Sequence, residues 1–133
     1  MSARIEGGSE QLLKGKNFCN VATLRADGSI HAVPVWVDVQ DGRPVLNTAE
    51  GRVWPRNLER DPRVTLTVQN MENPYEYVEV RGRVAERTTE GADEHIDALA
   101  QRYMGVESYP LRQPGEQRLI IRVEPEHVHH WGG

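Results

Sequence analysis

Two Asp-Gly turns, each set between apolar runs, constrain the fold of this chain more than any other feature. Asp27-Gly28 separates residues 18–25 from residues 30–39, and Asp41-Gly42 separates that second run from residues 44–48. Asp-Gly between alternating apolar segments is a strong hairpin signal, because both residues tolerate the positive φ of a tight turn. The sequence therefore predicts three antiparallel strands joined by two hairpins.

Three further runs have strand character. Residues 64–68 and 75–84 alternate between apolar and polar side chains, as half-buried antiparallel strands do. A last strand is predicted over 119–123, with Pro125 marking its end. About six antiparallel strands favour a small β-barrel over a parallel sheet, and a barrel also removes open sheet edges.

Two helices are expected beside these strands. A short one is predicted over 11–16, and a longer one begins after residues 88–91. The longer helix has apolar residues at helical spacing, namely Ile96, Leu99, Ala100 and Tyr103. The predicted architecture is therefore mainly β, a barrel with flanking helices.

Length and composition narrow the class of protein. A chain of 133 residues favours a single domain over 1–133, and a net charge of -4 argues against a nucleic-acid binder. The lone Cys19 excludes an internal disulfide and fits a reducing cytoplasm. No apolar run approaches the roughly 20 residues of a membrane span. Residues 1–8 lack an apolar signal core and are expected to be a loose arm, so we expect a cytoplasmic protein.

The segment 46–64 carries the strongest functional signal. Arg52, Arg56 and Arg60 are spaced four apart, so they would lie on one face of a short helix that Asp61-Pro62 stops. Guanidinium groups near a helix start can hold a phosphate, which suggests a phosphorylated cofactor. The alternative is an ordinary solvated helix face, because acidic residues stand among these arginines.

Pro34 interrupts the predicted strand 30–39. Proline cannot donate to a strand ladder, so it marks a bulge, an edge or a break. Either Pro34 makes a plain bulge, or the backbone near Val33, Val35 and Trp36 is left free to face a ligand.

These features occur together in one order. Residues 18–24, the Asp27-Gly28 turn, residues 33–36, Asn47-Thr48 and residues 56–64 follow one another at characteristic spacing. In this the chain resembles the flavin and deazaflavin oxidoreductases of the split β-barrel superfamily, relatives of pyridoxamine 5'-phosphate oxidase. Within that superfamily it most resembles the actinobacterial F₄₂₀-dependent branch. The resemblance spans about residues 18 to 123, and its most specific part is Arg-Asn-Leu-x-Arg-Asp-Pro-Arg-Val at 56–64.

The resemblance implies an FMN-binding split barrel that forms a homodimer, with two cofactor sites at the subunit interface. The cofactor ring would pack near Val33, Pro34, Val35 and Trp36. The strand end beneath the phosphate linker would be lined by Asn47 and Thr48, with the Thr48 hydroxyl as a donor. The phosphate would be surrounded by Arg52, Val53, Trp54 and Arg56.

One position departs from the pattern of the family. Relatives often carry a lysine three residues before the asparagine, where this chain has Trp54. Phosphate pairing would then fall on Arg52 and Arg56, and Trp54 would be free to stack on a ring. Alternatively, Trp54 and Trp36 simply pack the barrel mouth.

The activity implied is reduction of a small conjugated molecule, such as an enone, a quinone or a tetrapyrrole, by reduced coenzyme F₄₂₀. FMN is the alternative cofactor, in an oxidase or reductase of the same fold. A second alternative is a carrier that binds a cofactor or a tetrapyrrole without turnover. No catalytic side chain is assigned, because the cofactor carries the hydride chemistry. No metal site is predicted either, because His127, His129 and His130 lack a matching set of ligands.

Overall fold

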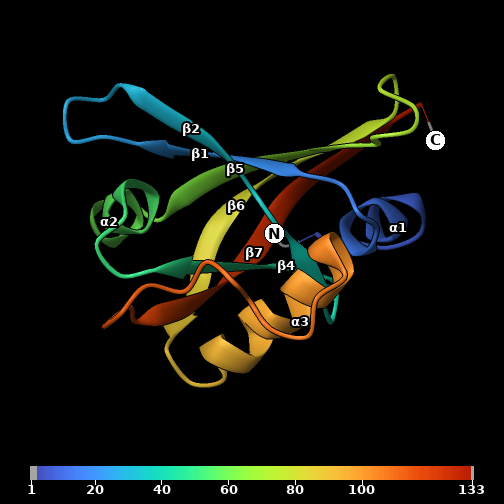
Figure 1. The fold of residues 1–133 in the computed structure, drawn as a ribbon. Coiled ribbons are helices and arrows are strands. Elements are labelled where there is room, and N and C mark those ends of the chain that lie inside the picture. Colours follow the sequence, from blue (N-terminus) through green and yellow to red (C-terminus); the bar gives the residue numbers. More distant parts are fainter. Residues whose placement is uncertain (1–2, 133) are drawn as a thin grey trace.

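The structure, a computed structural model, describes residues 3–132, which fold into seven strands and three helices (Figure 1). The strands are β1 (Cys19–Leu24), β2 (Ile30–Val35), β3 (Asp38–Gln40), β4 (Arg43–Ala49), β5 (Arg63–Gln69), β6 (Tyr77–Thr88) and β7 (Arg118–Trp131). The helices are α1 (Gly8–Lys14), α2 (Val53–Arg60) and α3 (Ala92–Met104). All strand pairs are antiparallel, in the order β2-β1-β5-β6-β7-β4-β3.

The connection between β2 and β3 closes this sheet into a barrel. The two strands lie at opposite ends of the strand order, yet only Trp36 and Val37 separate them in the chain. Three Cα steps span at most about 11 Å, so the two edges of the sheet must lie close together. The predicted barrel is confirmed, in the form of a split barrel whose two edges meet at Trp36.

The single strand predicted over 30–39 is therefore wrong in one respect, because the chain leaves one edge of the sheet at Val35 and joins the other at Asp38. Pro34 lies on β2, which pairs with β1 alone, and its partner there is Asn20 in unbroken register. Pro34 is thus an edge-strand proline rather than a bulge. Along β2, every second residue turns its backbone polar groups away from the sheet, where no strand of residues 3–132 pairs with them.

The last strand continues well past its predicted end. Pro125 lies inside β7 and pairs with Gly82 of β6, next to a shift in register between Arg81 and Gly82. A Cβ on Gly82 would lie 2.2 Å from the Glu124 carbonyl oxygen, so the strands approach closely at a residue that lacks a side chain. This irregularity accommodates a proline within a paired strand.

The expected loose arm is also wrong for the part of it that is described. The Ala3 amide donates to the Pro125 carbonyl at 2.7 Å, and the Ile5 amide donates to the Gly42 carbonyl at 2.8 Å. Ile5 is 1% exposed and belongs to the main core. Residues 1–2 lie outside the described residues.

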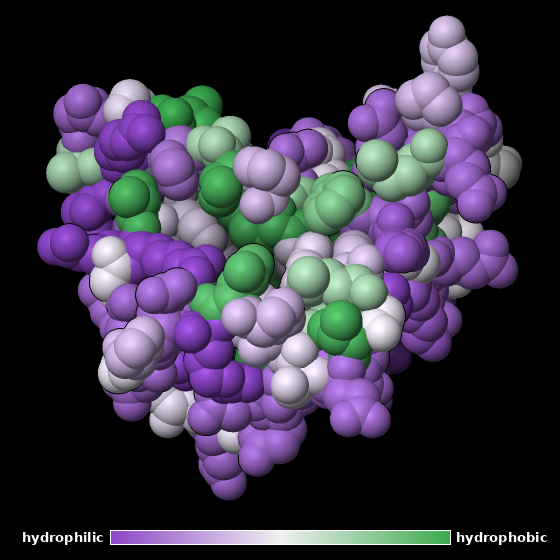
Figure 2. Space-filling view, viewed as in Figure 1, coloured by the Kyte–Doolittle hydropathy of each residue, from purple (hydrophilic) through white to green (hydrophobic). Residues whose placement is uncertain are grey.

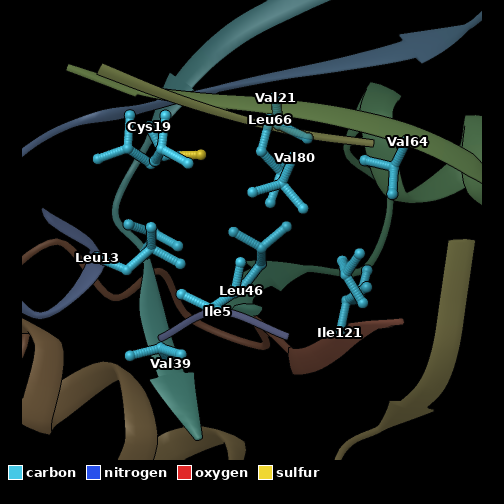
Figure 3. Close-up of a cluster of buried hydrophobic side chains, with 14 of the residues drawn as sticks. Ile5, Leu13, Cys19, Val21, Val39, Leu46, Val64, Leu66, Val80 and Ile121 are labelled. Atoms are coloured by element: carbon cyan, nitrogen blue, oxygen red, sulfur yellow. The ribbon is translucent and has the colours of Figure 1, made fainter. Parts of the chain in front are cut away.

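Inward-facing residues of the strands fill the barrel (Figure 3). Cys19 is fully buried among them, and this burial raises the pKa of its thiol. Helices α1 and α2 lie at opposite ends of the barrel in Figure 1, where Leu13 and Trp54 join the core. No helix in residues 3–132 is long and apolar enough to cross a membrane.

Candidate functional site

A cleft of about 250 Å³ lies where the chain crosses from one sheet edge to the other. Its lining comes from β2, β4, α3, β7 and the segments beside them, and consists of Phe18, Pro34, Val35, Trp36, Asn47, Arg52, Ile96, Tyr109, Leu111 and Arg118. Figure 2 shows apolar side chains gathered near the middle of the face between the β1–β2 hairpin and α3. The lining is thus mostly apolar, with two arginines and no carboxylate.

Five of the ten predicted cofactor residues line this cleft: Pro34, Val35, Trp36, Asn47 and Arg52. Two larger hollows, of about 390 and 370 Å³, contain none of the ten. The cleft is therefore the candidate site, although it is the smallest of the three.

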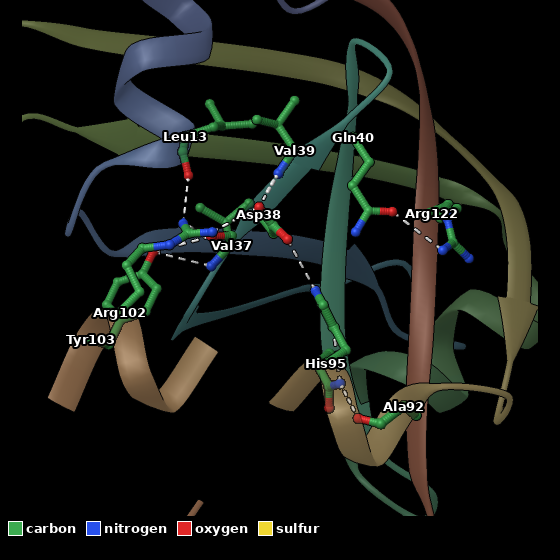
Figure 4. Close-up of polar contacts among 11 residues, drawn as sticks. Leu13, Val37, Asp38, Val39, Gln40, Ala92, His95, Arg102, Tyr103 and Arg122 are labelled. Atoms are coloured by element: carbon green, nitrogen blue, oxygen red, sulfur yellow. Dashed lines mark hydrogen bonds and ion pairs between the residues drawn. The ribbon is translucent and has the colours of Figure 1, made fainter. Parts of the chain in front are cut away.

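Aromatic rings build one wall of the cleft. Trp36 stacks on Tyr103 of α3 with centroids 5.1 Å apart and planes 4° from parallel, and Tyr109 meets it edge-on at 6.0 Å. The Tyr103 hydroxyl donates to the Asn17 carbonyl at 2.7 Å. It also accepts from the Val37 amide at 3.2 Å, as Figure 4 shows. Burial raises the pKa of Tyr103, so this phenol stays neutral and keeps the stack in place.

Asn47 lies on the face of β4 that looks toward α3, and its amide is fully committed. The Nδ2 group donates to the Ala92 carbonyl at 2.9 Å and lies 3.1 Å from His95 Nδ1. The Oδ1 atom accepts from Arg118 Nε at 2.9 Å. Asn47 therefore has no free hydrogen for a ligand and acts by holding its neighbours in place.

From His95, a partly buried polar chain continues to Asp38 of β3 (Figure 4). His95 Nε2 lies 3.3 Å from Asp38 Oδ2, and Arg102 Nη2 donates to Asp38 Oδ1 at 2.7 Å. Burial acts to raise the pKa of Asp38, but hydrogen bonds from His95, the Val39 amide and Arg102 lower it to about 2. Asp38 is therefore ionised at neutral pH, and it anchors the chain that ends at the cleft.

Thr48 is not where it was expected. Successive strand residues point to opposite faces, so Thr48 shares the face of Leu46, which lies in the barrel core, and not that of Asn47. Thr48 is 0% exposed, and its hydroxyl has no hydrogen-bond partner within residues 3–132. The side chain is thus sealed from the cleft in this structure.

The start of α2 lies at the mouth of the cleft and has no cap of its own. Arg52 is the N-cap residue, no side chain of residues 3–132 caps the helix, and its first turn has no acidic residue. The first helical N–H groups have no partner within a helix, and the amides of Val53 and Trp54 donate to no other backbone group of residues 3–132, so they are free for an outside acceptor. An anion at this helix start would be favoured by the helix dipole as well.

Two acidic residues of the segment, Glu50 and Glu59, are held away from Arg52 and Arg56. Arg87 of β6 forms ion pairs with Glu50 at 3.0 Å and with Glu59 at 3.1 Å. Within residues 3–132, Arg52 and Arg56 form no ion pair. The two arginines are exposed cations, which is the condition that a phosphate site needs.

Other residues of the segment have structural roles. Trp54 is 3% exposed and packs in the core, so its indole offers no face for stacking on a ring. Arg60 donates to the Leu24 carbonyl at 2.7 Å and to Asn57 at 3.1 Å, so it fastens α2 to the barrel. Of the remaining predicted residues, Val33 packs against the core, while Val53 and Arg56 are exposed outside the cleft lining.

Half of the lining was not predicted: Phe18, Ile96, Tyr109, Leu111 and Arg118. Arg118 is 4% exposed, with its carbon Cζ 5.1 Å from the Tyr109 ring centroid and its Nη1 paired with Glu116. In the sequence, Arg118 is only a charged residue before an apolar strand. A charge at such a position usually marks the end of a strand and does not indicate a binding site. The other four were missed because they lie in loops or on a helix face that only the fold brings to β2.

Comparisons with known proteins agree with the split-barrel fold. The family model of pyridoxamine 5'-phosphate oxidase matches residues 6–132. Among solved structures, an F₄₂₀ reductase superimposes with a TM-score of 0.82 at 28% identity, covering 94% of this chain and 98% of that one. A search of curated protein sequences finds no significant match.

Two more distant structures share the fold. A conserved hypothetical protein from Mycobacterium tuberculosis gives a TM-score of 0.72 at 22% identity over 96% of this chain and 86% of that one. General Stress Protein 26 from Bacillus anthracis gives 0.69 at 16% identity over 91% and 88% of the two chains.

Proposed function

Because the chain belongs to the pyridoxamine 5'-phosphate oxidase family, we propose that it is an F₄₂₀-dependent oxidoreductase. It would transfer a hydride from the reduced deazaflavin coenzyme to a small conjugated organic acceptor. The similarity to an F₄₂₀ reductase over nearly the whole of both chains carries this choice of cofactor.

The residues of the cleft fit such a cofactor. Trp36 is held by Tyr103 at a stacking distance of 5.1 Å and offers a flat wall to a ring. The unpartnered backbone of edge strand β2 supplies groups for the polar rim of that ring. Arg52 and Arg56, with the free amides at the start of α2, are suited to hold a phosphate.

When bound, the reduced deazaflavin would supply the hydride. The chain's own part is to orient the ring, to exclude water from one side of it and to balance negative charge. No acid or base of the described residues is assigned to the proton, because water suffices to deliver it.

We propose a homodimer with the site at the subunit interface. Two apolar residues of the lining remain exposed, Phe18 at 46% and Leu111 at 59%. A second subunit over the cleft would cover this rim and exclude water from the ring.

Steady-state consumption of reduced F₄₂₀ with a panel of enones, quinones and tetrapyrroles tests the proposal. Turnover with at least one acceptor is the expected result. Binding of F₄₂₀ without turnover on any acceptor would favour a carrier, and turnover with reduced FMN alone would assign the same fold to flavin chemistry.

A further inference from the structure

Arg118 is a buried cation at the inner side of the cleft that none of the phosphate-binding expectations uses. Its guanidinium is held from two sides. The Arg118 Nε atom donates to Asn47 Oδ1 at 2.9 Å, and Nη1 forms an ion pair with Glu116. The centroid of the Tyr109 ring lies 5.1 Å from the guanidinium carbon Cζ. These contacts fix the plane of the guanidinium before any ligand arrives.

The remaining nitrogen, Nη2, forms no hydrogen bond within residues 3–132. It is not a sealed group either, since Thr48 Oγ1 is the one buried side-chain polar atom of that part of the chain without a partner. Because Arg118 lines the cleft, Nη2 is the edge that a ligand in the cleft can reach.

The charges around the cleft leave an excess of positive charge. Burial acts to raise the pKa of Glu116, but hydrogen bonds from Arg118 and the Gln113 amide, with the charges of Arg118 and Arg52, hold it below its usual range. Glu116 is therefore ionised and balances Arg118, so the positive charge that remains at the cleft is that of Arg52. Arg118 acts on a ligand through the free hydrogens of Nη2, and no carboxylate of residues 3–132 lines the cleft to compete for them.

We propose that Arg118 is an anion-recognising residue of the cleft, and that the cleft selects a flat conjugated ligand with a negatively charged group. Asn47 and His95 act as positioning residues behind it, because the Asn47 amide gives both its hydrogens to Ala92 and His95 and so keeps Oδ1 turned toward Arg118. This inference rests on the proposed function only in naming the ligand's source, which is either the deazaflavin or the acceptor.

The test compares two probes of the same shape and different charge, 2-naphthoate and 2-naphthamide, titrated into the full chain and followed by tryptophan fluorescence. The wild-type protein is expected to bind the anion about 10- to 100-fold more tightly than the amide, as one charge-assisted hydrogen bond provides. The double variant E116Q/R118Q should lower this preference about tenfold, because the Arg118 hydrogen bond is lost while Arg52 still lines the cleft. It removes both charges of the pair, so no unpaired charge is left buried.

The control is a second ion pair on the same strand. Arg122 of β7 pairs with Glu86 and does not line the cleft, so E86Q/R122Q should keep the wild-type preference. Equal binding of the two probes by wild-type protein, or an undiminished preference for the anion in E116Q/R118Q, would overturn the inference.

Two further titrations identify the source of the charge. If E116Q/R118Q also loses affinity for F₄₂₀, the recognised anion belongs to the cofactor. If the variant keeps its affinity for F₄₂₀, and the F₄₂₀-loaded variant no longer shows the wild-type preference for 2-naphthoate over 2-naphthamide, the anion belongs to the acceptor. Failure of wild-type protein to bind F₄₂₀ would refute the proposed function, whereas the probe preference would stand or fall by itself.

Discussion

The barrel interior and the cleft are built in opposite ways, although both use β4. On the inner face of this strand, Leu46 is fully buried among aliphatic residues, and the Thr48 hydroxyl on the same face has no hydrogen-bond partner in the described part of the chain. On the face toward α3, Asn47 has a partner for each polar atom, and its network reaches Asp38 and Arg118.

This difference separates the region that supports the fold from the region that we propose binds a ligand. An apolar interior holds its shape through packed volume and tolerates one unpaired hydroxyl. A connected polar network fixes side-chain orientation, and each member depends on the others. The interior therefore supports the fold, while the network holds the cation that faces the cleft.

The largest expected effect tests the interior. Leu66 is fully buried in the core, so Leu66→Ala should lower the free energy of unfolding by about 2 to 5 kcal/mol, through lost burial and the cavity left behind. Urea denaturation measures this. Ile30→Ala at a 67% exposed site is the control and should stay within about 0.5 kcal/mol of wild type; a comparable loss there would contradict the assignment of the core.

The next effect tests the mouth of the cleft. Arg52→Ala with Arg56→Ala should weaken F₄₂₀ binding by about 3 kcal/mol, because each charged hydrogen bond contributes roughly 1.5 kcal/mol at an exposed site. Stability should not change, since neither arginine forms an ion pair within residues 3–132. Arg60→Ala is the matched comparison on the same helix: it should destabilise α2 and leave the phosphate contact in place. Unchanged affinity in the double variant would exclude the phosphate assignment.

A third prediction concerns the network behind the cleft. The pKa of Asp38 is lowered from an ordinary 3.8 to about 2, so its contribution to stability is complete above pH 4 and is lost as the pH falls toward 2. This contribution is on the order of 2 kcal/mol. Asp38→Asn should lack that part of the acid dependence, which denaturation at a series of pH values would reveal. Parallel curves for the two proteins would contradict the role of Asp38.

The smallest effect compares the two neighbours on β4. Thr48→Val keeps the shape of the side chain and removes an unpaired buried hydroxyl, so stability should rise or stay within about 1 kcal/mol, with F₄₂₀ affinity unchanged. Thermal unfolding and an F₄₂₀ titration measure the two quantities. Weaker F₄₂₀ binding by Thr48→Val would contradict the conclusion that Thr48 is sealed from the cleft.

The sequence predicted the fold well, because local signals determine most of it. The Asp41-Gly42 turn has φ of 54° and 74°, as the hairpin requires, and the alternation in β5 matches its burial pattern. The prediction of the fold from the sequence was wrong where segments distant in the chain meet. Pro125 stays in a strand because Gly82 on another strand accommodates it.

The lining of the cleft was predicted only in part, for the same reason. The arginine segment indicated the mouth of the cleft, since its residues are neighbours in the chain. Arg118 lies 71 positions from Asn47, with which it pairs, and no spacing rule connects them. For Trp54 both stacking on a ring and packing at the barrel mouth stayed open, because a sequence does not tell which side of a short helix packs on the barrel.

Titration of the purified protein with F₄₂₀ and, separately, with FMN, followed by tryptophan fluorescence, tests the central claim most directly. The account predicts saturable binding of F₄₂₀ that is clearly tighter than that of FMN, and lost affinity when Arg52 and Arg56 are replaced. Preference for FMN would contradict the deazaflavin assignment. Binding of neither cofactor would contradict the claim that the cleft and the start of α2 form a cofactor site.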